Sequence, residues 1–272
     1  MDSPTIDARL LLEAAAPVTR VDILTDPHRT LDAEGAARLE AFVQRRERRE
    51  PVSQILGRKA FWTLMLNVGP QVLTPRPDTE TLLDVALAAF PPERAFSLLD
   101  LGVGSGAILL AILAERPKAR GLGVDISEEA LAVARDNADL LGLAPRAAFL
   151  RGDWTAGLDS ESFDLAAANP PYIPSGEIDG LEPEVRDYEP RAALDGGPDG
   201  LDAYRRLAPE ILRVLRPGGM FAVEIGVGQR AAVEALFRAA GAEPIAAHQD
   251  LGGRDRVITG TKKPLGNQQS NR

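Results

Sequence analysis

The sequence has no cysteine, only two histidines and no long apolar run. Without cysteine the chain cannot form disulfides, use a thiolate nucleophile or hold Cys-ligated zinc or iron–sulfur clusters. No apolar stretch reaches the roughly 18 residues that span a bilayer, and the opening MDSPTIDAR lacks the basic start of a signal peptide. We therefore expect a cytoplasmic protein with no membrane contact.

Positive charge is also scarce, since the formal net charge is −9. Proteins that hold duplex nucleic acid through its phosphates normally carry a basic balance or patch. The one dense basic run, Arg45–Arg49, includes Glu47 and is interpreted as the solvated end of a helix. This charge balance disfavours direct DNA binding.

No group of histidine, aspartate and glutamate has the spacing of a metal site, so we expect no metal. His28 and His248 both lie away from every motif. A histidine base is therefore not expected either.

The periodicity predicts an α/β protein with a small helical module in front. Residues 3–50 are typical of helices, with Ser3-Pro4 and Asp32 as helix starts and a short helix at Val18–Leu24. Alternation over Gln54–Leu73 predicts a β-hairpin. The expected units are a helical module (1–52), a hairpin linker (53–75), an α/β domain (76–262) and a disordered tail (263–272).

Short apolar strands then alternate with amphipathic helices, which predicts a doubly wound, mostly parallel sheet. A first helix, Thr81–Phe90, is expected to be capped by Asp78 or Thr79. The expected strands are Phe96–Leu101, Leu122–Asp125, Ala148–Arg151, Phe163–Ala168, Met220–Ile225 and Arg256–Gly260. The expected helices between them are Ala107–Glu115, Glu128–Leu141, Leu201–Leu215 and Gln229–Ala240.

A glycine-rich loop follows the first strand of this unit. Its residues are Gly102, Val103, Gly104, Ser105 and Gly106. Glycines allow a tight turn and close approach of a ligand to the backbone. A dinucleotide site has G-x-G-x-x-G, whereas this loop is G-x-G-x-G with Asp100 just before it, which disfavours a pyrophosphate and a nicotinamide oxidoreductase. The acid suits a nucleoside with an amino-acid tail.

Two further loops at strand ends suit the same ligand. Asp125 ends the second strand, where a carboxylate can accept both ribose hydroxyls, while Ser127 is the better cap for the next helix. Trp154 follows the third strand and could pack on an adenine, with Asp153 accepting from its amine; a half-buried loop tryptophan is the alternative. The combined pattern resembles class I S-adenosylmethionine-dependent methyltransferases, which implies a Rossmann-like, mostly parallel sheet of seven strands.

Asn169-Pro170-Pro171-Tyr172 ends the fourth strand. Prolines stop a strand and fix the backbone, so this turn is rigid and lies beside the glycine loop. The Asn169 side-chain oxygen and the Pro170 carbonyl could each accept one N–H of a planar NH₂ group, while Tyr172 packs over it. The motif indicates methylation of such a group, and adenine, cytosine and a glutamine amide all qualify.

The residues as a whole resemble one family, the protein-(glutamine-N5) methyltransferases of peptide chain release factors, known as PrmC/HemK. The resemblance covers about Asp7 to Gly260. Besides the motifs above it rests on two segments, LTPRPDTE (73–80) and YEPRAALDGGPDGL (188–201).

The resemblance implies that the chain methylates the glutamine of the Gly-Gly-Gln loop of class I release factors. S-adenosyl-L-methionine would be the donor, held by Gly102 to Gly106, Asp125, Trp154 and Asn169. Asn169, Pro170, Pro171 and Tyr172 would line the glutamine pocket. The helical module would recognise the factor, and we expect a monomer.

Some points stay open at this stage. A nucleic-acid amino-methyltransferase and a catalytically inactive donor-binding protein are the alternatives. The segment Pro174–Leu201 is predicted to form part of the substrate mouth, with Glu189 and Arg191 as substrate contacts or loop-fixing residues; a capped surface loop is the alternative. Arg76 and Glu80 either close the site or form a local ion pair.

Overall fold

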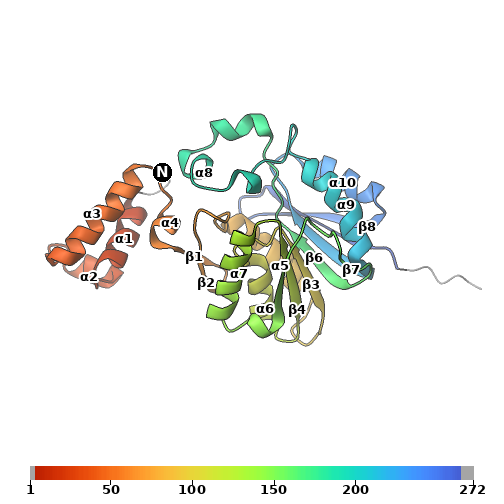
Figure 1. The fold of residues 1–272 in the computed structure, drawn as a ribbon, viewed down its shortest axis with the longest axis horizontal. Coiled ribbons are helices and arrows are strands. Elements are labelled where there is room, and N and C mark those ends of the chain that lie inside the picture. The colour runs from red at the N-terminus through yellow and green to blue at the C-terminus, as the bar shows by residue number, and fades with distance from the viewer. Residues whose placement is uncertain (1–3, 265–272) are drawn as a thin grey trace, which may run out of the picture.

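The computed structural model describes residues 4–264, so the predicted cap Ser3 and most of the predicted disordered tail lie outside the described residues. Figure 1 shows a sheet unit with helices packed on both faces and a separate group of helices at the amino-terminal end. That group contains α1 (Pro4–Ala15), α2 (Arg20–Thr25), α3 (Ala33–Glu47) and the short α4 (Val52–Leu56).

Local sequence explains where two of these helices begin. Asp32 accepts a hydrogen bond from the Gly35 amide and caps α3, as predicted. Thr19 and Asp22 form a capping box, so the second helix starts at Arg20 rather than at Val18.

The hairpin is shorter than the sequence indicates. Its strands are β1 (Arg58–Phe61) and β2 (Leu64–Asn67), paired antiparallel. The predicted hairpin segment from Gln54 is wrong at its start, because Gln54 to Leu56 complete α4, and Gly57 ends that helix in the left-handed conformation.

The main sheet has seven strands in the order β5-β4-β3-β6-β7-β9-β8. Strands β3 to β7 run parallel, whereas β9 pairs antiparallel with β7 and with β8. The strands are β3 (Ser97–Leu101), β4 (Arg120–Asp125), β5 (Ala147–Arg151), β6 (Phe163–Ala168), β7 (Leu215–Glu224), β8 (Ala242–Gln249) and β9 (Asp255–Lys262). This confirms the predicted Rossmann-like, mostly parallel sheet of seven strands.

Alternate residues of the buried strands pack on opposite faces. Leu98 and Leu165 contact the layer of α5 (Glu80–Ala89), α6 (Ala107–Glu115) and α7 (Glu128–Leu140). Leu99 and Ala166 contact the layer of α9 (Asp202–Val214) and α10 (Arg230–Ala239). Strands buried on both faces read as continuous apolar runs, as parallel strands between helix layers do.

One strand, β8, is absent from the elements expected from the sequence. It contains Pro244, and a proline within a run argues against a strand. The structure accommodates Pro244 because β8 is the edge strand and its register shifts between Ala242 and Ile245. Strand β7 likewise begins at Leu215, earlier than the predicted Met220.

The segment between β6 and α9 holds three short helices rather than a bare loop. They are η3 (Ser175–Gly180), α8 (Pro183–Arg186) and η4 (Arg191–Ala193). In Figure 1 this segment lies above the sheet, on the side of the amino-terminal helices. No helix in the part of the chain that is described has the length and apolar character to cross a membrane.

Candidate active site

The glycine loop adopts the backbone that its sequence predicts. Gly102, Gly104 and Gly106 have φ angles of 74°, 53° and 84°, in the left-handed region that other residues avoid. The Asp125 carboxylate accepts the Gly104 amide at 2.9 Å and the Ser127 amide at 3.0 Å. Asp125 therefore fixes the loop after β3 against the start of α7.

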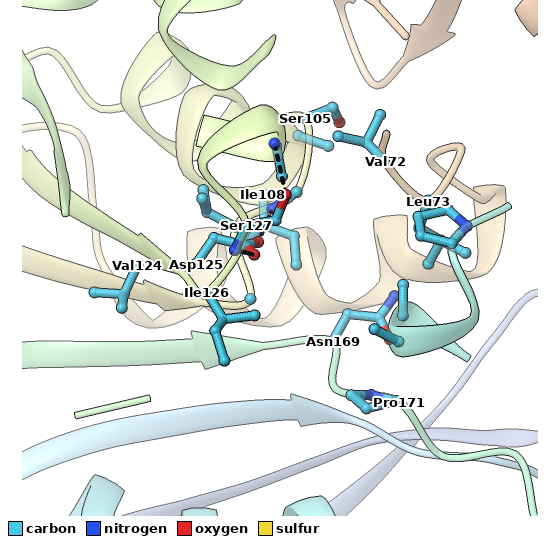
Figure 2. Close-up of a pocket in the computed structure, with 18 of the residues that line it drawn as sticks. Val72, Leu73, Ser105, Ile108, Val124, Asp125, Ile126, Ser127, Asn169 and Pro171 are labelled. Carbon is cyan, nitrogen blue, oxygen red and sulfur yellow. Dashed lines mark hydrogen bonds between the residues drawn. The ribbon is translucent and has the colours of Figure 1, made fainter. Parts of the chain in front are cut away.

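These residues surround a cavity of about 330 Å³, within the size range of small-molecule sites. Figure 2 shows Asp125, Ile126 and Ser127 on one side of it, and Asn169 and Pro171 on the other. The segment Gln71–Arg76, the glycine loop and Trp154 complete the wall. Predicted site residues from the ends of four strands thus line one cavity, and these eight are Gly102, Val103, Gly104, Ser105, Asp125, Trp154, Asn169 and Pro171. The predicted Gly106 is not part of its lining.

Trp154 is half-buried and lies over the glycine loop. A methyl group on Gly102 would lie 3.5 Å from the Trp154 ring, so the indole covers the loop backbone closely. Its neighbour Asp153 forms an exposed ion pair with Arg206 at 2.9 Å. The predicted contact between Asp153 and an adenine amine stays a prediction, and it would have to share that carboxylate with Arg206.

Asp100 lies beneath the glycine loop and is almost completely buried. One carboxyl oxygen accepts the Leu109 amide at 3.0 Å, while the other has no hydrogen-bond partner among the described residues. Burial without a counter-charge raises the pKa of Asp100 to about 7. The acid is therefore poised between its two charge states near neutral pH.

The Asn169–Tyr172 turn divides between the cavity and the protein interior. Asn169 and Pro171 line the cavity, but Pro170 and Tyr172 do not. Pro170 is buried, and the Tyr172 hydroxyl donates to Glu224 at 3.3 Å. The predicted packing of Tyr172 over a planar substrate group stays a prediction; its observed partner is a carboxylate.

Asn169 hydrogen-bonds to a residue on another segment. Its amide nitrogen donates to Thr79 Oγ1 at 3.2 Å, and Thr79 Oγ1 donates to Glu224 Oε2 at 2.6 Å. The expected role of Thr79 or Asp78 as a side-chain cap of α5 is wrong, because the Thr79 hydroxyl is committed to Glu224 and Asp78 pairs with Arg256.

The β6–α9 segment encloses the backbone of Tyr172. Gly196 and Gly200 are in contact with Tyr172: a Cβ on either would clash with its Cα or its carbonyl oxygen. The Gln229 side chain donates to the same carbonyl at 2.9 Å. The glycines of the 188–201 segment thus serve to hold the turn, which the sequence alone did not reveal.

Glu189 joins two segments that line the cavity, Gln71–Arg76 and the segment between β6 and α9. Its carboxylate is buried, accepts two bonds from Arg76 at 2.7 and 2.8 Å, and also accepts the Thr74 amide. The alternative of a local Arg76–Glu80 pair is wrong, because Glu80 accepts the Trp62 amide instead. Of the two predicted roles for Glu189 the geometry fits loop fixing, whereas Arg191 is exposed beside Asp195.

The basic run at the end of α3 is not simply solvated, which corrects the interpretation above. Arg46 is largely buried and pairs with Asp7 and Glu184, both at 2.9 Å, and Arg49 also binds Glu184. Gln54 donates to the Tyr188 carbonyl at 2.9 Å. The amino-terminal helices are therefore joined to the β6–α9 segment by polar contacts.

Asn137 is another residue that the sequence did not single out. It is fully buried in α7, accepts the Asn67 amide at 2.7 Å, and donates to the carbonyls of Asn67 and Ser105. It thereby connects the hairpin to the glycine loop. In the sequence, the only indication of this role is weak, since Asn137 is one asparagine on the apolar side of an amphipathic helix.

The cavity suits a nucleoside that bears an amino-acid tail. Its lining is mostly apolar, the glycine backbone is open to close approach, and Asp125 offers a carboxylate at the end of β4. Among residues 4–264, no group of three or more His, Asp or Glu side chains could hold a metal ion.

Comparison with known proteins agrees with this geometry. The family model "Methyltransferase domain" matches residues 92–253, and "PrmC N-terminal domain" matches residues 1–57. The limits of the predicted units, at residues 52, 75 and 262, stay predictions. A methyltransferase structure from Pyrococcus furiosus aligns with a TM-score of 0.55 at 16% identity, covering 82% of this chain and 98% of that one, which supports the fold alone.

Relatives of known name are much more similar in sequence. The release factor glutamine methyltransferase of Caulobacter vibrioides is 65% identical over 265 residues, covering 97% of this chain and 92% of the relative. The protein of the same name from Rhodospirillum rubrum is 46% identical over 266 residues, covering 98% and 81%. The chain belongs to the release factor glutamine methyltransferase family.

Proposed function

We propose that this protein methylates the side-chain amide nitrogen of the glutamine in the Gly-Gly-Gln loop of class I peptide chain release factors. The observation that carries the proposal is the place of Asn169 on the wall of a donor-sized cavity, in a chain that matches named relatives over nearly its whole length. The family assignment favours this function over the nucleic-acid alternative.

The methyl donor is S-adenosyl-L-methionine in this proposal, with no metal taking part. When bound, it supplies an electrophilic methyl group on a sulfonium. Gly102 to Gly106 present backbone to it, Asp125 accepts from its ribose, and Trp154 covers its adenine. Each Asp125 oxygen accepts one backbone amide and has a second lone pair, so the carboxylate can accept the ribose hydroxyls while it keeps its contacts to Gly104 and Ser127.

The chemical problem is a weak nucleophile, because the lone pair of an amide nitrogen is delocalised. Asn169 Oδ1 and the Pro170 carbonyl accept the two N–H groups of the glutamine, which aims the nitrogen and stabilises its growing positive charge. Pro170 and Pro171 keep these acceptors rigid, and Tyr172 completes the glutamine pocket. No strong base is needed, since the methylated nitrogen loses its proton readily.

The remaining parts follow from the substrate. The amino-terminal helices and the β6–α9 segment, joined by Arg46, Arg49 and Glu184, form the surface that recognises the factor. We place the reaction in the cytoplasm, where release factors act, and expect a monomer. Sedimentation of the purified protein checks the oligomeric state.

Methyl transfer to a purified release factor tests the proposal. The protein is incubated with radiolabelled donor in three separate reactions, which contain a class I factor, duplex DNA or RNA. We expect label only on the factor, and mass spectrometry should place 14 Da, roughly one methyl group, on the Gly-Gly-Gln glutamine. Label on nucleic acid alone would overturn the proposal, and donor binding without any transfer would favour an inactive donor-binding protein.

A further inference from the structure

The proposed reaction depends on which way the Asn169 side chain is turned. A primary amide carries an acceptor oxygen and a donor NH₂ of similar shape, so a half-turn exchanges the two at little steric cost. Only the orientation with Oδ1 toward the cavity can accept an N–H of the substrate. A neighbour that distinguishes the two ends is therefore required.

Thr79 is that neighbour. Its hydroxyl oxygen lies 3.2 Å from Asn169 Nδ2 and 2.6 Å from Glu224 Oε2. A hydroxyl has one proton, and a carboxylate can only accept. Thr79 must therefore give its proton to Glu224 and accept one from Asn169, which turns the NH₂ group of Asn169 toward Thr79 and its oxygen the other way.

Glu224 is held firmly enough to impose this order. It is 1% exposed, its second carboxyl oxygen accepts the Tyr172 hydroxyl at 3.3 Å, and its backbone carbonyl accepts the Tyr204 hydroxyl at 2.7 Å. The parallel register pairs Ala168 with Val223, so the next residues along, Asn169 and Glu224, lie side by side at the ends of β6 and β7.

We propose that Thr79 and Glu224 form a positioning relay, which fixes the Asn169 amide with its oxygen toward the substrate and anchors Tyr172 through the same carboxylate. The proposal rests on the methyltransfer function proposed above. Neither residue touches the reacting atoms; both act through Asn169 and Tyr172. In the sequence, the sign that Glu224 has a special role is its place as a single acid within the apolar run Phe221–Ile225.

The relay has a defined direction only while Glu224 is ionised. A protonated carboxyl could donate to Thr79, which would then donate to Asn169 and favour the reversed amide. Burial raises the pKa of Glu224 to about 7. The titratable or charged groups that face it are Asp78 of the short helix η1 (Pro77–Thr79), Tyr172 after β6, Tyr204 of α9 and Arg256 of β9.

Substitutions at Thr79 test the relay directly. Thr79→Val keeps the shape but removes the hydroxyl, and Thr79→Ser keeps the hydroxyl as the matched control. At saturating donor and release factor we expect Thr79→Val to lower kcat about tenfold or more, and Thr79→Ser about threefold at most. The donor Kd, measured by calorimetry, should change by a similar small factor in both variants, because Thr79 lines the cavity in either case and neither substitution alters the glycine loop.

A double-mutant cycle separates positioning from packing. In an Asn169→Ala background Thr79→Val should cause no further loss of kcat, since nothing remains to be turned. If the unaltered enzyme is active and Thr79→Val has the same kcat, the relay is overturned. It is also overturned if Thr79→Val lowers kcat in the Asn169→Ala background as much as it does in the unaltered enzyme. Absence of methyl transfer by the unaltered protein instead overturns the proposed function itself.

If Thr79→Val fails to fold or to bind donor, Glu224→Gln provides a second test, because Glu224 is the other residue of the relay. The unaltered enzyme should gain kcat as pH rises through about 7, because ionised Glu224 sets the relay. Glu224→Gln cannot ionise, so its kcat should be lower at pH 8 and flat across this range. Equal kcat in Glu224→Gln and the unaltered enzyme at pH 8 overturns the relay.

Discussion

Replacing Gly200 by alanine tests whether the β6–α9 segment holds the Asn169–Tyr172 turn in place. Gly200 has a φ of +74°, and a Cβ there would overlap the Tyr172 carbonyl oxygen and lie 2.7 Å from Gln229 Nε2. The bond from Gln229 to that carbonyl is part of the same contact. Alanine at this position must therefore move the turn, the segment, or both.

The expected loss of stability has two parts. A left-handed alanine costs about 1–2 kcal/mol wherever it occurs, and forcing an extra carbon into packed backbone costs about 1–3 kcal/mol more. Gly142 has a φ of +68° with open space around its Cβ position, so Gly142→Ala is a matched control that carries only the first part. We expect a loss of about 2–5 kcal/mol for Gly200→Ala and about 1–2 kcal/mol for Gly142→Ala.

Two measurements on each variant complete the test. Urea unfolding gives the free energy of unfolding, and methyl transfer to a release factor gives kcat. Gly200→Ala should lose at least about tenfold in kcat, because a shifted turn misplaces Asn169, whereas Gly142→Ala should keep kcat. Equal unfolding free energies and equal kcat in the two variants would show that contact with Tyr172 has no consequence.

Three further outcomes are expected. Asn169→Ala should lower kcat by at least about a hundredfold with little change in donor Kd, since its acceptor acts mainly in the transition state; equal kcat would remove Asn169 from the mechanism. Arg76→Ala should destabilise the protein by about 2–4 kcal/mol by leaving the buried Glu189 carboxylate without its partner, and Arg76→Lys should restore part of this in urea unfolding. Burial raises the pKa of Asp100 from 3.8 to about 7, so the stability that its protonated form contributes below pH about 4 is lost as pH rises to about 7. Asp100→Asn should therefore gain about 2–3 kcal/mol over the unaltered protein on going from pH 5 to pH 8, and a pH-independent difference would contradict this.

The sequence predicted those parts of the fold that follow from local patterns. Glycine spacing, the Asp125 strand end and the proline-rich turn are each contained in a short stretch of chain, and parallel strands bring their carboxyl ends to one edge of a sheet. For that reason Gly104, Asp125 and Asn169 could be assigned to one site from their positions in the sequence, and they line one cavity.

The contacts that support this site could not be predicted in the same way. Thr79 and Glu224 are 145 positions apart, and Arg76 and Glu189 are 113 apart. Thr79 looked like a helix cap because short-range rules assign hydroxyls at helix starts to capping, but a buried carboxylate competes better for its proton. Strand β8 was missed because the edge position that tolerates Pro244 is a property of the assembled sheet.

Asn137 has a consequence for how the two binding events communicate. Its side chain bonds directly to the backbone of Asn67 in the hairpin and to the carbonyl of Ser105 in the glycine loop. The hairpin follows directly on the helices proposed to face the protein substrate, so Asn137 connects the chain beside those helices to the glycine loop. We expect a shift of those helices on substrate binding to reach the donor loop through Asn137, and donor binding would then alter the affinity for the release factor by the same factor.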